Sequence, residues 1–312
     1  MKIATTTADF HVYCKTDAER IRELHRAGFR YIDLNMYSFK PDSPYMQENW
    51  REAVRELGEL AAELGMSFVQ AHLQGGNPLS DDPAHVDFLV KATLRSIEIC
   101  EMLGIKNTVV HSGYAEGISK EEWFRVNKLF YEKLFPTAER CGVNILCENS
   151  TASNMGEKYF INTGTDMREF IKYVGHPLFH GCWDTGHANC EGAQYDQIMA
   201  IGDELYAIHY NDNHGKKDDH VAPFLGRLNH DEVLTALIDV GYKGYFTLEC
   251  DSSLIGYNQW TGKRRRFGGE IGATKLREPQ LFMQRHIEAM MYETAVWMLE
   301  QYGLADQAVQ EV

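Results

Sequence analysis

The sequence predicts an α/β protein with the fold class of a (βα)8 TIM barrel, formed by a single domain over residues 1–312. Three observations support this prediction. Short apolar runs alternate with amphipathic segments eight times, a glycine recurs where a helical segment gives way to the next apolar run, and no Gly-x-Gly-x-x-Gly follows the first run. Alternating strands and helices favour a parallel sheet, and the missing glycine motif argues against a dinucleotide-binding open sheet.

The apolar runs have the length and composition of parallel strands that are buried on both faces. The eight predicted strands are Ile3–Thr7, Tyr31–Asn35, Ser67–His72, Thr108–His111, Asn144–Glu148, Phe179–Asp184, Leu205–His209 and Tyr245–Glu249. The predicted helices are Asp17–Ala27, Trp50–Leu64, Asp82–Leu103, a segment that begins with the capping-box pattern Ser119-Lys120-Glu121-Glu122, Thr165–Val174, Tyr195–Ile201, Asn229–Val240 and a long C-terminal helix within residues 279–303. Eight such units can close into a barrel, which leaves no unpaired strand edge.

A glycine follows six of the predicted helices, and an apolar residue or a His-Pro pair comes directly after it. The six are Gly28, Gly65, Gly104, Gly142, Gly175 and Gly241. A glycine in the left-handed conformation ends a helix and lets the next apolar residue pack back against it. Repeated use of this device indicates one repeated unit rather than two unlike domains.

The composition narrows the function classes. The chain is 44% hydrophobic and 24% charged, as is usual for a globular protein, and its formal net charge is −14. Nucleic-acid binding relies on basic side chains, so this charge disfavours DNA or RNA, although Lys263–Arg266 is one local basic segment. No run approaches the length of a transmembrane helix. The N-terminal residues are too polar for a signal peptide and the seven cysteines include no Cys-x-x-Cys pair, so we expect a reduced, cytoplasmic protein.

Six of the predicted strands end at a residue type that binds metals. These residues are His72, His111, Glu148, Asp184, His209 and Glu249. Because a barrel gathers the C-terminal ends of its strands at one mouth, we expect these side chains to lie together. Imidazoles combined with carboxylates suit a divalent ion such as Mn²⁺, Zn²⁺, Co²⁺ or Mg²⁺.

A structural interpretation is open for each of these residues. His72 is equally well explained as a hydrogen-bonded core or rim side chain. Glu148 and Glu249 end apolar strands, where an unpaired carboxylate is costly to bury, so a salt bridge is their structural alternative. Asp184 and His187 converge only if the backbone reverses between them, and Gly186 would permit this through a positive φ.

Five motifs occur together at the predicted strand ends. They are Val110-His111-Ser112-Gly113, Cys147-Glu148-Asn149, Asp184-Thr185-Gly186-His187-Ala188, Ile208-His209-Tyr210-Asn211-Asp212 and Gly241-Tyr242-Lys243-Gly244 leading to Glu249. The chain thereby resembles the sugar phosphate isomerase/epimerase superfamily, the xylose isomerase-like TIM barrels, over most of its length. The resemblance implies that His187 faces the substrate. It also implies one divalent ion, most often Mn²⁺, bound by Glu148, Asp184, His209 and Glu249.

The implied activity is that of a metal-dependent isomerase or epimerase, which acts on a sugar or sugar-derived ketone through an enediolate. Glu148 and Glu249 are the expected catalytic residues, one removing a proton and the other returning it. The side chains expected to bind the substrate are His72, His111, His187, His220 and Trp260. If a hydroxyl leaves instead, the protein is a lyase of the same superfamily, either an inosose-type dehydratase or a subunit that cleaves 3-keto-C-glycosides with a small second subunit. A non-catalytic sugar-binding subunit would be favoured only by an incomplete metal set.

Two features of the sequence differ from the pattern of the ketose 3-epimerase branch and bear on the predicted activity. The ketose 3-epimerase branch usually has an arginine six residues after the histidine of the seventh strand, where this chain has Gly215. Asp218-Asp219-His220 is similar to the dehydratase and isomerase branches, and also to the Asp-x-His of apurinic endonucleases, which bind three zinc ions. The positions that match that trinuclear site are His72, His111, Glu148, Asp184, His187, His209, Asp218, His220 and Glu249. The acidic net charge favours the sugar enzyme over the nuclease.

The segment 255–278 follows the eighth strand and lies outside the repeated unit. We expect it to form a lid over the mouth or a subunit contact, with a solvated loop as the alternative. Within it, Trp260 could stack on a sugar ring and Arg264–Arg266 could hold an anionic group. We expect a homo-oligomer whose partner in the cell is a small carbohydrate substrate, with the C-terminal helix covering the barrel wall or forming the subunit contact.

Overall fold

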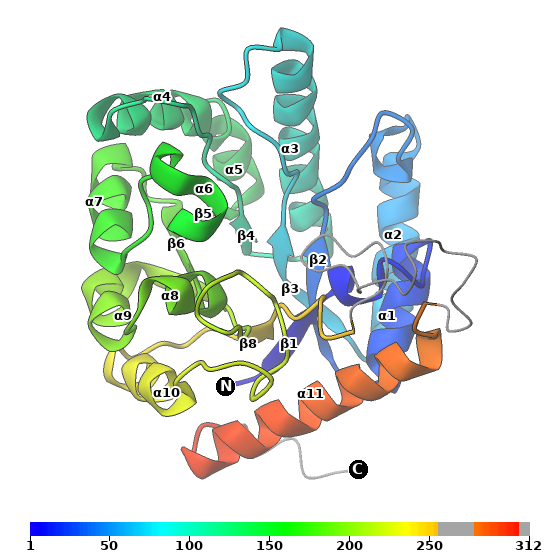
Figure 1. Ribbon diagram of the computed structural model, residues 1–312. Helices are drawn as coiled ribbons and strands as arrows, with labels where there is room; N and C mark the ends of the chain where they lie inside the picture. The colour runs from blue at the N-terminus through cyan, green and yellow to red at the C-terminus, as the bar shows by residue number, and fades with distance from the viewer. Residues whose placement is uncertain (255–277, 306–312) are drawn as a thin grey trace, which may run out of the picture.

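A computed structural model of the chain describes residues 1–254 and 278–305 and contains eight parallel strands arranged as a barrel (Figure 1). The strands are β1 (Ile3–Thr6), β2 (Tyr31–Asn35), β3 (Ser67–His72), β4 (Asn107–Val109), β5 (Asn144–Glu148), β6 (Phe179–Asp184), β7 (Leu205–His209) and β8 (Phe246–Leu248). Consecutive strands pair from β1 to β7, and β8 pairs with β1. The predicted fold class is confirmed.

The barrel closes between β7 and β8 through Tyr210, the residue that follows β7. Its N–H donates to the carbonyl of Thr247 at 2.7 Å, and its own carbonyl accepts the N–H of Glu249 at 3.1 Å. Each strand therefore has a neighbour on both sides, which removes the exposed edges of an open sheet. The same two hydrogen bonds fix Glu249 beside the residues that end β7.

The helices follow the predicted alternation, with additions. They are α1 (Asp17–Arg26), α2 (Trp50–Glu63), α3 (Pro83–Leu103), α4 (Lys120–Glu132), α5 (Phe135–Cys141), α6 (Ala152–Met155), α7 (Gly164–Val174), α8 (Thr185–Glu191), α9 (Tyr195–Ile201), α10 (His230–Asp239) and α11 (Leu281–Gln301). Single 3-10 turns are η1 (Thr7–Phe10), η2 (Pro44–Met46), η3 (Gly156–Lys158) and η4 (Gly202–Glu204). The short helices α5, α6 and α8 were not predicted; segments of seven residues or fewer carry little periodicity, and of these only α9 was predicted.

The predicted glycine caps are confirmed. All six glycines have a positive φ, from 62° to 110°. At five of them the apolar residue that follows donates its N–H back into the helix, for example from Phe29 to the carbonyl of Leu24 at 3.1 Å and from Ile105 to that of Cys100 at 2.9 Å. These bonds satisfy carbonyls that the end of a helix would otherwise leave open.

The capping box predicted at Ser119 is only half formed. Ser119 Oγ accepts the N–H of Glu122 at 3.2 Å, but the Glu122 carboxylate binds Arg125 at 2.6 Å instead of returning to the cap. The Glu122 carboxylate thus pairs with Arg125, one turn further along the helix, rather than with the backbone N–H of Ser119. A complete box occurs at Thr16 and Glu19, at the start of α1.

The apolar core has two layers. The larger lies between the strands and the helices, and the smaller fills the inside of the barrel with Val109, Leu146, Cys182 and Ala207. Each of these four stands two positions before a residue of the mouth, as Leu146 stands before Glu148. Side chains two positions apart in a strand point to the same face. The mouth residues therefore point to the inside of the barrel, directly above these four apolar side chains.

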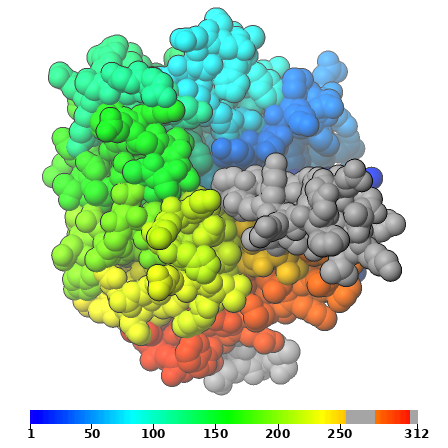
Figure 2. Space-filling view, viewed as in Figure 1, coloured from blue at the N-terminus to red at the C-terminus, as the bar shows by residue number. Residues whose placement is uncertain are grey.

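The last helix, α11, lies against α1 and β1 on the outside of the barrel (Figure 1). Its Met291, Ala295 and Met298 are buried, whereas Phe282 and Trp297 are exposed. In Figure 2 the orange and red surface of this helix forms the lower edge of the visible face. No helix among the described residues is long and apolar enough to cross a membrane.

The segment predicted to form a lid, with Trp260 and Lys263–Arg266, lies outside the described residues apart from Glu278. The expectations about its lid role and its anion binding therefore stay predictions.

Candidate metal and substrate site

Four side chains from neighbouring parts of the barrel converge at its mouth. Glu148 ends β5, Asp184 ends β6, His209 ends β7, and Glu249 follows β8. All four are buried, and one ligand atom from each lies within 4.8 Å of those from the others. Closure of the barrel thus brings together residues that are up to about a hundred positions apart in the sequence.

His209 has polar neighbours at both ring nitrogens. Its Nδ1 lies 2.5 Å from Glu148 Oε1 and 3.3 Å from Glu249 Oε2. Its Nε2 lies 2.8 Å from the side-chain nitrogen of Gln70 and 3.3 Å from Asp33 Oδ2. Partners behind a ring of this kind fix its orientation. Asp33 and Gln70 were not predicted, because they lie inside β2 and β3; the available signal was a polar residue within an apolar strand.

Asp184 is held by the first turn of α8. Its Oδ1 accepts the N–H of His187 at 2.6 Å, and its Oδ2 accepts a hydrogen bond from Asn211 Nδ2 at 2.8 Å. The reason predicted for Gly186 is wrong, since it lies inside helix α8 rather than at a reversal with positive φ. Glycine is required there for space, because a Cβ would lie 1.7 Å from Asn211 Oδ1.

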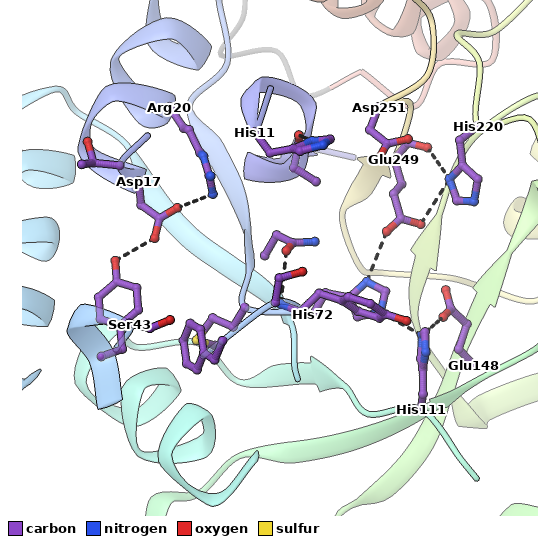
Figure 3. Close-up of a pocket in the computed structure, with 18 of the residues that line it drawn as sticks. His11, Asp17, Arg20, Ser43, His72, His111, Glu148, His220, Glu249 and Asp251 are labelled. Carbon is purple, nitrogen blue, oxygen red and sulfur yellow. Dashed lines mark hydrogen bonds and ion pairs between the residues drawn. The ribbon is translucent and has the colours of Figure 1, made fainter. Parts of the chain in front are cut away.

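His72 and His111 link the two glutamates along the other side of the mouth (Figure 3). His72 Nδ1 lies 3.2 Å from Glu249 Oε1, and its Nε2 lies 2.8 Å from His111 Nε2. His111 Nε2 in turn lies 2.8 Å from Glu148 Oε2. The ligand atoms of His72, His111 and Glu148 also fall within 4.8 Å of one another.

A third set of ligand-type side chains lies on the opposite side, around the loop that follows β7. Asp218 Oδ2 is 3.1 Å from His187 Nε2 and 3.0 Å from His220 Nε2. Asp184, His187 and His220 place ligand atoms within 4.8 Å of one another. The structure therefore brings every described residue of the predicted site to one mouth; Trp260 lies outside the described residues.

The local environment separates the proton affinities of these groups. Burial raises the pKa of Asp184 to about 6. Burial acts the same way on Glu249, but the charge of His209 and the hydrogen bond from His72 outweigh it and hold the Glu249 pKa at about 2. Burial alone would lower the pKa of His187, whereas nearby carboxylates, Asp184 first among them, raise it to about 10. Glu148 is affected like Glu249: burial raises its pKa, but the charge of His209 and the hydrogen bond from His111 outweigh burial and lower it well below its ordinary value, so both glutamates are ionised and able to accept a proton.

The mouth opens into a cavity of about 1470 Å³. Its inner end is lined by the site, including His72, His111, Glu148 and Glu249, and its outer end by α1, α2 and the loop between β2 and α2 (Figure 3). Tyr37, in that loop, has its ring centroid 5.6 Å from those of both His72 and His111. Tyr37 was not predicted, because an aromatic residue in a loop carries no periodic signal.

The donor chemistry of the central group fits a divalent metal ion. Glu148, Asp184, His209 and Glu249 offer three carboxylates and one imidazole, all buried. Three carboxylates so close together repel one another unless protons or a cation lie between them. Oxygen-rich sets with one nitrogen suit Mn²⁺, Mg²⁺ or Zn²⁺ better than a soft metal such as Cu⁺.

A closed parallel barrel with carboxylates and imidazoles at its C-terminal mouth places the protein among the (βα)8 barrels with a polar functional mouth. The model of one family, the xylose isomerase-like TIM barrel, matches residues 21–267, and the chain belongs to this family. The family predicted from the strand-end motifs is confirmed.

Individual relatives are more distant. The chain is 25% identical over 249 residues to the protein y4fM of Sinorhizobium fredii, covering 70% of this chain and 76% of that one. It is 31% identical over 138 residues to the D-psicose 3-epimerase of Ruminiclostridium cellulolyticum, which covers 44% of each.

Solved structures show the same fold at low sequence identity. The IOLI protein, solved with a zinc atom, superimposes with a TM-score of 0.72 at 17% identity and covers 97% of this chain and 99% of that one. A D-psicose 3-epimerase solved in the presence of D-fructose gives 0.71 at 17% identity and covers 96% and 99%.

Proposed function

We propose that the chain is a divalent-metal-dependent isomerase or epimerase that acts on a sugar or sugar-derived ketone. The observation that carries the proposal is the buried set Glu148, Asp184, His209 and Glu249, whose ligand atoms lie within 4.8 Å of one another. The similarity to a D-psicose 3-epimerase and to a zinc-containing structure of the same fold supports it.

These four side chains would hold the ion, with Mn²⁺ as the first choice and Mg²⁺, Co²⁺ or Zn²⁺ as alternatives. When bound, the ion supplies Lewis acidity that polarises the carbonyl of the substrate. Asn211 and the start of α8 would keep Asp184 in place, and Asp33 and Gln70 would keep the ring of His209 in place.

Glu148 and Glu249 would move the proton. Their carboxylates reach His209 Nδ1 from two strands, at 2.5 and 3.3 Å. One would remove the proton on the carbon next to the carbonyl, and the other would return it. Return to the opposite face of the same carbon inverts that centre, and return to the neighbouring carbon isomerises the sugar. Both outcomes share the first step, so the site supports both.

The four histidines His72, His111, His187 and His220 line the cavity and would contact the substrate. Burial lowers the pKa of His111, which keeps its imidazole neutral near pH 7 and able to hydrogen bond with a hydroxyl. His187, whose pKa the nearby carboxylates raise to about 10, carries a proton near pH 7, and its donation to a leaving hydroxyl would give dehydration, which is how a lyase would use the same site.

A second candidate function, a three-metal phosphodiester hydrolase, is favoured by one specific observation. Besides the central group, the sets His72–His111–Glu148 and Asp184–His187–His220 also bring ligand atoms within 4.8 Å. The formal net charge of −14 argues against a nucleic-acid substrate, so the sugar enzyme stands first.

Metal analysis of the purified protein and its Glu249→Gln variant tests the proposal, together with a screen of keto-sugars and inososes for exchange of the proton beside the carbonyl with D₂O. We expect one ion per chain and metal-dependent exchange in the wild type, with exchange lost in Glu249→Gln. Glu293→Gln, on the exposed side of α11, is the matched control and should behave as the wild type.

Three zinc ions per chain with no exchange on any sugar would favour the hydrolase and defeat the first proposal. The single domain over residues 1–312, the cytoplasmic location, the homo-oligomer and the small second subunit stay predictions from the sequence.

A further inference from the structure

We infer that the cavity is built for a keto-sugar that carries a second sugar ring, rather than for a free monosaccharide. This inference rests on the proposed function and concerns the outer half of the same cavity. Pockets for drug-sized ligands measure roughly 300–1,000 Å³. The cavity here measures about 1470 Å³. A single six-carbon sugar placed beside Glu148 and Glu249 would leave its outer half empty.

The ring of Tyr37 stands where the two halves meet. It approaches His72 and His111 at 5.6 Å between ring centroids, yet 40% of the residue stays exposed. It rests on Gly75, whose N–H donates to the Tyr37 carbonyl at 2.9 Å. Tyr37 N–H donates to Asn35 Oδ1 at 3.2 Å, so the loop is tied at two points. A ring fixed in this way offers an apolar face to a sugar ring.

The outer half combines aromatic rings with hydrogen-bonding groups. Figure 3 shows Asp17, Arg20 and Ser43 on one side of His72, with the reactive carboxylates on the other. Tyr45 O–H donates to Asp17 Oδ2 at 2.8 Å, and the rings of Phe39 and Tyr45 lie 5.4 Å apart. A sugar ring has apolar faces and an edge of hydroxyls, and this lining can serve both.

Charges of both signs line the outer half, Lys15, Arg20 and Arg22 against Asp17, Glu56, Glu59 and Glu63, so no excess of positive charge favours an anionic second group. Arg20 Nη1 lies 2.9 Å from Asp17 Oδ1, so the two charges cancel each other. Both side chains are largely shielded from solvent, with 19% and 11% exposed. A phosphate would have to compete with Asp17 for this arginine, whereas a hydroxyl can bond to the pair without breaking it.

The test compares D-fructose with lactulose and isomaltulose, ketoses that carry a second sugar ring at different positions. Titration calorimetry on the metal-loaded protein should show at least one of the two disaccharides binding about tenfold more tightly than D-fructose, equal to about 1.4 kcal/mol. Ser38→Trp, at an exposed position of the cavity lining, and Phe39→Ala should both abolish this gain and leave D-fructose binding unchanged. Phe282→Ala, exposed on α11, is the matched control and should keep the gain.

Equal affinity for D-fructose and both disaccharides in the wild type would overturn the inference, as would a gain that survives in Ser38→Trp. Since calorimetry measures binding alone, these outcomes do not depend on catalysis. A disaccharide preference without proton exchange on any keto-sugar would instead contradict the proposed function and leave the second-ring subsite standing. Thermal unfolding of each variant checks its folding, and Ser38→Trp decides if Phe39→Ala does not fold.

Discussion

The aromatic ring of Tyr37 rests directly on the backbone of Gly75, where only a glycine leaves it room. A Cβ at position 75 would lie 2.1 Å from Cζ of the tyrosine ring. The glycine therefore acts at the site through space and not through its backbone conformation, because Gly75 is not among the residues with positive φ. Displacing the ring would change the wall of the cavity beside His72 and His111.

Gly75→Ala is accordingly expected to behave like Tyr37→Ala. Each should lower kcat/KM for a keto-sugar by about tenfold, or about 1.4 kcal/mol in the barrier. The double variant should be no worse than either single one, because both changes remove the same ring contact. Exchange kinetics in D₂O measure the effect, with Gly58→Ala in helix α2 as the control. Losses that add up in the double variant would refute the coupling.

Gly186→Ala should weaken metal binding by roughly 10- to 100-fold, the usual effect of losing a partner that orients a ligand. The added Cβ would collide with Asn211, whose Nδ2 donates to Asp184 Oδ2 at 2.8 Å. Calorimetric titration of the metal-free variant with Mn²⁺ measures the change. A folded Gly186→Ala protein with wild-type affinity would show that Asn211 does not position Asp184.

Asp9 and Glu288 are a pair of buried acids that connects the N-terminal segment to α11. Thr5 O–H donates to Asp9 Oδ2 at 2.7 Å, and Gln284 Nε2 donates to Glu288 Oε1 at 2.9 Å. The two acids also hydrogen bond to each other, which requires that one of them carries a proton. Burial raises the pKa of both groups well above the ordinary range, and Asp9 raises that of Glu288 further.

An acid whose pKa is higher in the folded than in the unfolded chain stabilises the fold while it is protonated. Its contribution is complete below the ordinary carboxyl pKa and is lost as the pH rises through the raised value. Glu288→Gln cannot ionise, so its unfolding temperature should fall less than that of the wild type as the pH rises above the ordinary carboxyl range. Glu293→Gln, exposed on the same helix, should follow the wild type. Parallel curves for wild type and Glu288→Gln would rule out this role.

Removal of the metal should destabilise the protein. A ligand present at about 100 times its Kd adds about 2.7 kcal/mol to the free energy of unfolding. The chelated protein should therefore unfold at a lower temperature than the Mn²⁺-loaded protein, and Asp184→Asn should lose most of that difference. Thermal unfolding with EDTA and then with added Mn²⁺ measures it. An unfolding temperature that does not respond to either addition would count against a bound ion.

The barrel and the mouth residues could be predicted because both depend on local patterns. Strand length, glycine caps and alternation gave the eight units, and a strand that stops on Glu148 or His209 marks the mouth without any knowledge of neighbours. Parallel strands place their C-terminal ends at one side by topology alone.

Other features depend on contacts between distant segments and could not be predicted. Tyr37 reaches the histidines because its loop is tied to the loop after β3. Gly186 is needed because of Asn211, a residue of the loop after β7. Asp33 lies inside strand β2, and its carboxylate contacts Nε2 of His209, the ring nitrogen that faces away from Glu148 and Glu249. In each case the contact depends on how distant segments pack together, and the spacing of residues in the sequence does not predict such contacts.

Anomalous diffraction from crystals of the Mn²⁺-loaded protein tests the central claim most directly. We expect a single strong peak within ligand distance, about 2.0–2.6 Å, of oxygen or nitrogen atoms from Glu148, Asp184, His209 and Glu249. The absence of a peak between these four side chains, or a peak bound elsewhere on the chain, would contradict it.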